Sequence, residues 1–252
     1  MSAARLILLG TTVFIIALLA TLPAPRLLAP LQTPGLQFFG IEGSLTSGHV
    51  HGITSRNRPL LENLSWQLSP LQLLMVKLGY EITGEAAGAN PGEVFTARVS
   101  LSPLGRWTVR DFKGVLSLQS LGTMAGQTYL PLEGQAQLDL GELSWKQDQS
   151  LTAQGSLRLA DLRWTLAQTP LPLGDYEAVI TPEGDDLDVK INALSGPLEV
   201  LGEARYKADR SYELHLQLRP KTGADPVLQN LLRTLGNPDH QAWYHLRRNG
   251  KF

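Results

Sequence analysis

Apolar and polar residues alternate along most of the chain with the two-residue period of β-strands, in short runs separated by turn residues. Residues 60–68 are one example, in which alternation places on one strand face Leu60, Glu62, Leu64, Trp66 and Leu68. Only the glutamate interrupts the apolar character of that face. Runs spaced by about 10–12 residues predict an antiparallel, mainly β body, built as a curved sheet or groove or as a sandwich.

Two stretches have helical spacing instead of alternation. In the first, Ser69 is an N-cap and Pro70 takes the first helical position. Its apolar positions are Leu71, Leu74, Met75 and Leu78. In the second, Asp225 and Pro226 have the same roles and Gly236 marks the C-terminal end. Its apolar positions are Leu228, Leu231, Leu232 and Leu235. We expect these two short helices to cover one face of the sheet.

The N-terminal segment follows neither pattern. Residues Leu6 to Leu22, with Val13 near the centre, include no charged side chain. About 17–20 apolar residues allow a helix to cross the hydrocarbon core of a bilayer. The sequence therefore predicts a single-pass membrane anchor and its exit over residues 1–29, followed by one β-rich domain over residues 30–252.

A cleaved signal peptide is the alternative interpretation of this segment. Its apolar core is longer than the roughly 7–15 residues of a signal peptide, and no Ala-x-Ala site follows it. These features favour an uncleaved anchor. Arg5 and the N-terminal amine precede the segment and Arg26 follows it, so the positive-inside rule favours a cytoplasmic N-terminus. We expect the β-rich domain on the other side of the membrane.

The composition narrows the range of functions. The chain has no cysteine, which excludes disulfides, thiolate metal sites and cysteine nucleophiles. Its net charge of −1 gives no reason to expect a nucleic-acid partner. The 24 glycines and 16 prolines punctuate the chain and favour many short strands over long helices.

The sequence shows no recognisable catalytic or phosphate-binding motif, so we predict no enzyme activity and no cofactor. His49 and His51 are two residues apart on a predicted strand and could face one metal ion, but no third ligand is placed beside them. The acidic stretch at residues 185–188 lacks the spacing of a calcium loop and is typical of a hairpin turn. We therefore predict no metal site.

Two further features bear on binding. The basic stretch at residues 247–251 could contact a protein partner or anionic lipid, although most such stretches are simply solvated. Leucine dominates the apolar strand positions, and a leucine-lined face without a cover would bind lipid or another protein.

A weak internal echo, that is, a similarity within the chain, relates residues 134–145 to residues 155–164, and each run ends in tryptophan. Either a true repeat or chance similarity of leucine-rich alternation explains it.

The order of these features resembles the protein N family of the bacterial type II, or general, secretion pathway. The resemblance covers nearly the whole chain and is most specific at residues 66–70 and 223–236. The residues that carry it are Gly43, Gly48, Trp66, Pro70, Gly223, Asp225, Pro226 and Gly236. The chain departs from the family pattern near Thr46, where an aromatic residue is expected, and near Ala242, where a glycine is expected.

The resemblance implies a single-pass protein of the inner membrane of Gram-negative bacteria, with its C-terminal domain in the periplasm. Such a protein is an accessory structural subunit of the type II secretion system, which exports folded proteins across the outer membrane, and its partners are other components of that system. The resemblance brings no catalytic residues. The β-rich body also looks like groove-forming sheets of envelope proteins that handle lipid, so the alternative function is a lipid- or hydrophobe-binding β-groove.

Overall fold

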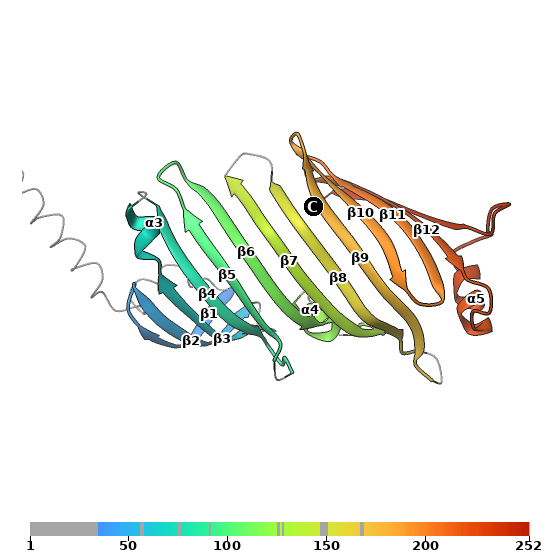
Figure 1. The fold of residues 1–252 in the computed structure, drawn as a ribbon. Helices are drawn as coiled ribbons and strands as arrows, with labels where there is room; N and C mark the ends of the chain where they lie inside the picture. Colours follow the sequence, from blue (N-terminus) through green and yellow to red (C-terminus); the bar gives the residue numbers. More distant parts are fainter. Residues whose placement is uncertain are drawn as a thin grey trace, which may run out of the picture.

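The computed structural model describes residues 35–55, 58–74, 77–90, 92–124, 127, 129–146, 151–166 and 169–251. Strands in this part form one antiparallel sheet whose spatial order follows the sequence order from β1 to β13 (Figure 1). Their bounds are β1 Leu36–Gly43, β2 Ser47–Ser55, β3 Arg58–Leu68, β4 Leu78–Ala86, β5 Val94–Leu101, β6 Arg106–Ser117, β7 Leu132–Lys146, β8 Thr152–Trp164, β9 Leu171–Glu183, β10 Asp186–Ser195, β11 Leu198–Tyr206, β12 Ser211–Pro220 and β13 Tyr244–Lys251.

The mainly β, antiparallel prediction is confirmed, and the single twisted sheet replaces the sandwich alternative. Three short helices interrupt the succession of strands: α3 Pro70–Leu74, α4 Leu118–Met124 and α5 Pro226–Arg233. Helices α4 and α5 lie at the same end of the strands, where they connect β6 to β7 and β12 to β13 (Figure 1). Helix α3 connects β3 to β4 at the opposite end of the strands.

The strand register divides the sheet into an apolar and a charged face. Directly paired residues of neighbouring antiparallel strands point to the same side. One such row crosses four strands through Leu216, Gly202, Ile191 and Ala178. We call this side the inner face, because α4 and α5 pack on it, and the opposite side the outer face. Each strand therefore contributes alternate residues to the two faces, as its alternating sequence predicts.

The core lies where the two helices meet the inner face, which we call the helix-covered end. Leu228 and Leu232 of α5 are 1% and 3% exposed, and Ala136 of β7 is fully buried. The Tyr176 hydroxyl donates a 2.6 Å hydrogen bond to the Leu173 carbonyl, so its polar atom is satisfied inside this core. Burial, followed by the adjacent Asp175 carboxylate, raises the pKa of Tyr176 to about 12 and keeps this donor protonated.

Helix α4 is attached to the sheet by one buried carboxylate. Glu93, which is 5% exposed, accepts hydrogen bonds from the Ser117 backbone N–H at 2.9 Å and from the Ser120 hydroxyl at 3.2 Å. The Asn90 amide donates a third bond at 2.6 Å. Burial alone would raise the pKa of Glu93, but these donors outweigh it and lower the pKa. The charge thereby links the β4–β5 turn to the start of α4.

The start of the second predicted helix is confirmed, because α5 begins at Pro226 and the Asp225 side chain accepts a 2.7 Å bond from Val227 N–H. The helix ends at Arg233, before the predicted positions Leu235 and Gly236, and Leu235 is exposed. The first is shorter than predicted. It covers only Pro70–Leu74, since Leu78 already belongs to β4. Its Leu71 side chain is 65% exposed instead of packing on the inner face.

The predicted strand face at residues 60–68 is wrong at its start. Asn63, with a φ of 51°, is the extra residue of a β-bulge in β3. The register therefore pairs Leu61 with Ala86 and Trp66 with Ile82, on the inner face. Leu64, Trp66 and Leu68 keep the predicted alternation, whereas Leu60 and Glu62 lie on the other side. This shift removes the one charge that interrupted the predicted apolar face.

The two runs of the internal echo form β7 and β8, which are neighbours in the sheet. Because they are antiparallel, their tryptophans lie at opposite ends: Trp145 pairs with Trp107, and Trp164 pairs with Leu132. The predicted anchor with Leu6, Val13 and Leu22 lies outside the described residues. Among the residues that are described, no helix is long and apolar enough to cross a membrane.

Candidate functional site

The family-motif residues form two separate structural clusters. In the first, Gly43 pairs with Gly48, and Gly48 pairs with Trp66 across β1, β2 and β3. The indole ring covers Gly48 so closely that an added Cβ would lie 2.2 Å from its Cζ2 atom. The indole N–H donates a 3.1 Å bond to the Ser44 carbonyl. This cluster fixes the β1–β2 hairpin, and Pro70 begins α3 directly beyond β3.

The second cluster surrounds α5. Gly223, with a φ of 82°, lies in the turn after β12, Asp225 caps the helix and Pro226 occupies its first position. Gly236, with a φ of 131°, lies just beyond the helix end. These are backbone roles: positive φ angles, an N-cap and a helix start. The structure therefore places the two clusters at different strands of the sheet and does not join them in one site.

The two departures from the family pattern have different structural settings. Ala242 has a φ of 63°, a left-handed conformation in which glycine is free of Cβ strain. An expected glycine at this position therefore has a backbone reason. Thr46 lies in the β1–β2 turn, where its hydroxyl is 2.8 Å from the Ser44 hydroxyl. Nothing in the structure explains an aromatic preference there.

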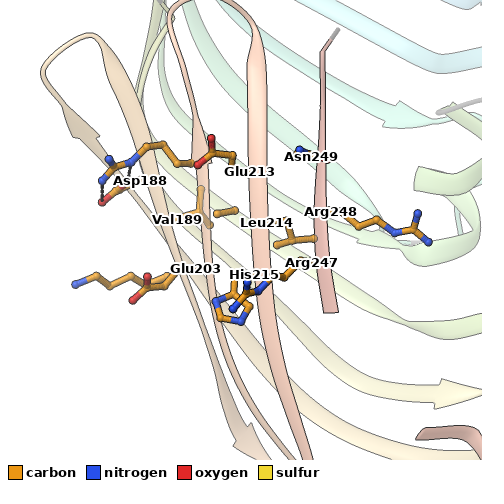
Figure 2. Close-up of a pocket in the computed structure, with 12 residues that line it drawn as sticks. Asp188, Val189, Glu203, Glu213, Leu214, His215, Arg247, Arg248 and Asn249 are labelled. Carbon is orange, nitrogen blue, oxygen red and sulfur yellow. Dashed lines mark hydrogen bonds and ion pairs between the residues drawn. The ribbon is translucent and has the colours of Figure 1, made fainter. Parts of the chain in front are cut away.

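An open pocket of about 650 Å³ lies across β10–β13 (Figure 2). Its charged lining includes Asp188, Lys190, Glu203, Arg205, Glu213 and Arg247. Alternation on neighbouring strands brings acidic and basic side chains together on the outer face. The basic stretch at residues 247–251 forms the C-terminal part of β13, the last strand of the described sheet, and its Arg247, Arg248 and Asn249 lie along this pocket.

The pocket charges largely neutralise one another. Arg205 donates to Asp188 at 2.9 Å and to Glu183 at 2.7 Å, while Lys207 donates to Glu213 at 2.6 Å. The hydrogen bond from Arg205 is the main reason why the pKa of Asp188 is lowered. A carboxylate held ionised by a fixed partner is a poor general base. The pocket therefore has the chemistry of a solvated surface that makes polar contacts.

Histidines provide the other candidate chemistry on the outer face. His49 and His51 have ring centroids 4.8 Å apart, and His51 Nδ1 lies 3.1 Å from the Gly40 carbonyl. His215 stacks on His245 at 5.8 Å, and His245 Nε2 lies 2.9 Å from an Asp239 carboxylate oxygen. Within the described part of the chain, no group of three or more histidine or acidic side chains could hold a metal ion. The acidic stretch at residues 185–188 forms the β9–β10 turn and the start of β10.

The inner face contains a second candidate surface at the strand ends opposite to α4 and α5, which we call the open end. A register row there joins Leu78, Leu101, Trp107 and Trp145. Leu78 and Trp107 are each 41% exposed and Trp145 is 37% exposed, with the two indoles stacked at 6.2 Å. This pair is not among the residues predicted from the sequence, although antiparallel pairing of β6 with β7 brings the two tryptophans together.

Fold and surfaces together define a class: a twisted antiparallel sheet with a charged outer face and an inner face that helices cover at one end only. The family model for type II secretion system (T2SS) protein N matches residues 34–247. This chain therefore belongs to the type II secretion system protein N family.

Two relatives support this assignment over nearly their full lengths. The chain is 26% identical over 252 residues to the type II secretion system protein N of Aeromonas hydrophila, covering 93% of this chain and 92% of the relative. It is 26% identical over 264 residues to the protein of the same name from Vibrio cholerae serotype O1, covering 97% and 96%. No solved structure shows a significant match.

Proposed function

We propose that this chain is an accessory structural subunit of the type II secretion system that supports the export of folded proteins across the outer membrane. The family match over residues 34–247 carries the proposal, because this range includes strands β1 to β12 and half of β13. The proposed partners are other components of the secretion system. The outer face offers them exposed polar side chains at regular cross-strand positions, which suits polar protein contacts.

Gene deletion in the native host tests this function. We expect less secreted enzyme in the medium and more of it retained in the periplasm, with recovery when the full chain is supplied from a plasmid. Purification of the full chain from gently solubilised envelopes should recover other secretion components. Unchanged secretion together with purification free of such components would contradict the proposal.

The proposed location is the inner membrane, with residues 1–29 as a single-pass anchor and the sheet in the periplasm. The apolar segment from Leu6 to Leu22 and the preceding Arg5 support this orientation. Alkaline phosphatase fused after Phe252 is active only outside the cytoplasm and should therefore be active here. A stably produced but inactive fusion would reverse the orientation, and complete release of the chain by osmotic shock would exclude the anchor.

A further inference from the structure

We propose that the uncovered part of the inner face binds the acyl chains of an anionic phospholipid, with Arg248 of β13 contacting the headgroup phosphate. The proposal concerns a ligand that the secretion role does not require. It rests on the chemical uniformity of this face, its partial exposure, its paired backbone and one unpaired cation at its margin.

The inner face carries a long uncharged path that starts beside Arg248. Directly paired residues follow one another across β12 to β6, namely Leu214, Ala204, Val189, Ile180, Gly155, Leu140 and Phe112. The six strand spacings from β12 to β6, of about 4.8 Å each, give the path a length of roughly 29 Å. The acyl chains of one bilayer leaflet span about 15 Å, half of the hydrocarbon core. The path therefore has room for a full acyl chain.

The described residues cover this path only in part. Leu214, Ile180 and Phe112 remain partly exposed, in contrast to Leu228 beneath α5. The row beginning at Leu78, with its exposed Trp107 and Trp145, borders the same face at the open end. Burial of such a continuous apolar surface is favourable in proportion to its area, so an apolar ligand would be stabilised here.

The paired backbone favours an acyl chain over a polypeptide segment. Each strand from β2 to β12 has a neighbour on both sides, and its backbone N–H and C=O groups are hydrogen-bonded to these neighbours. A peptide lying on this face would find few partners for its own backbone groups, and unpaired buried amides are unfavourable. An acyl chain has no polar group along its length. In the described strands β4–β13, the inner positions given by the register include one charged side chain, that of Arg248.

Arg248 gives the face its charge complementarity. It pairs with Leu214 on the inner side, and Figure 2 shows its side chain pointing away from the outer pocket, opposite to Arg247. It forms no ion pair with a described residue, whereas Arg205 and Arg219 of the outer face are bound to acidic neighbours. A guanidinium group binds phosphate oxygens through two parallel hydrogen bonds. An anionic phospholipid therefore satisfies both the apolar path and its terminal cation.

Photo-cross-linking of the full chain in its native membrane tests the proposal. Benzoylphenylalanine at Ile180 would probe the inner path, and the same residue at Val179, its exposed neighbour on the outer side of β9, is the matched control. We expect intact-mass spectrometry to find a phospholipid adduct at Ile180 and little at Val179. No lipid adduct at Ile180, equal adducts at both positions, or a cross-link from Ile180 to a second copy or another protein would overturn the proposal.

The headgroup contact is tested with Arg248→Glu and its neighbour Arg247→Glu, each combined with the Ile180 probe. The full chains are reconstituted into vesicles of phosphatidylcholine, with or without phosphatidylglycerol. We expect Arg248→Glu to lower the phosphatidylglycerol adduct about tenfold, as for loss of one charged hydrogen bond, and Arg247→Glu to leave it nearly unchanged. Equal yields of the phosphatidylglycerol adduct in both variants would show that Arg248 does not contact the headgroup. Arg248→Gln, with an unchanged circular dichroism spectrum, separates this effect from misfolding.

Discussion

The two ends of the inner face arise from the same alternation of residues, yet they have different environments. At the helix-covered end, α5 places Leu228 and Leu232 against the sheet and both are almost completely buried. At the open end, Leu78, Trp107 and Trp145 keep more than a third of their surface exposed. The same strands thus contribute a core at one end and an unpartnered apolar surface at the other.

This difference shows where stability and binding can be separated. Burial beneath the helices lowers the free energy of the folded chain, so changes there act on its stability. The side chains at the open end are less buried and therefore stabilise the fold less. Packing in the core does not explain why these positions are apolar. The proposed lipid provides that explanation.

The largest effect is expected from Leu228→Ala at the helix-covered end. Removing a fully buried leucine side chain leaves a cavity and lowers the free energy of unfolding by about 2–5 kcal/mol. Val227→Ala, on the exposed side of the same helix, is the control and should change it by less than about 0.5 kcal/mol. Urea titration of the full chain in detergent micelles, followed by circular dichroism, measures both. Equal losses would show that α5 does not form the core.

The next effect is expected at the attachment of α4. Glu93→Gln weakens the bonds from Ser117 N–H and the Ser120 hydroxyl and should lower the free energy of unfolding by about 1–3 kcal/mol. The pKa of Glu93 in the folded chain is below its ordinary value of 4.5. Its contribution is therefore complete above that pH and disappears as the pH falls through the lower folded value.

This pH dependence gives a direct measurement. The difference in unfolding free energy between the natural chain and Glu93→Gln should be constant near neutral pH and shrink below about pH 4.5. Ser102→Ala is the control, because the half-buried Ser102 hydroxyl also accepts a hydrogen bond from a backbone N–H, that of Arg106, but does not ionise in this pH range. A difference that grows on acidification would mean that burial, not hydrogen bonding, dominates at Glu93.

A smaller effect is expected from Trp107→Ala at the open end, although more atoms are removed than in Leu228→Ala. The stacked pair with Trp145 is partly exposed, so we expect a loss of about 1 kcal/mol. Phospholipid capture at Ile180 should fall at the same time. The same denaturation measurement and cross-linking assay test this. A loss as large as that of Leu228→Ala would make the open end part of the core.

The sequence predicted some of these features because their causes are local. The caps of α5, Asp225 and Pro226, act through neighbouring backbone atoms, and the alternation at residues 64–68 reports directly on the two strand faces. The bulge at Asn63 depends on its partner strand, although asparagine tolerates a positive φ more readily than most residues. The exposure of Trp107 was not predictable, because alternation identifies an apolar face without showing what covers it.

The smallest effect has the opposite sign and comes from Ala242→Gly, in the turn that leads from α5 to β13. Its φ of 63° is strained for alanine and relaxed for glycine, so the substitution should raise the free energy of unfolding by up to about 1 kcal/mol. Ala208→Gly, in the β11–β12 turn without a positive φ, is the control and should be neutral or slightly destabilising. Tyr244, two residues later, is buried in the helix-covered core. Relief of strain at residue 242 should therefore stabilise that end of the sheet and leave phospholipid capture unchanged. Altered capture would show that the two ends are coupled through β13.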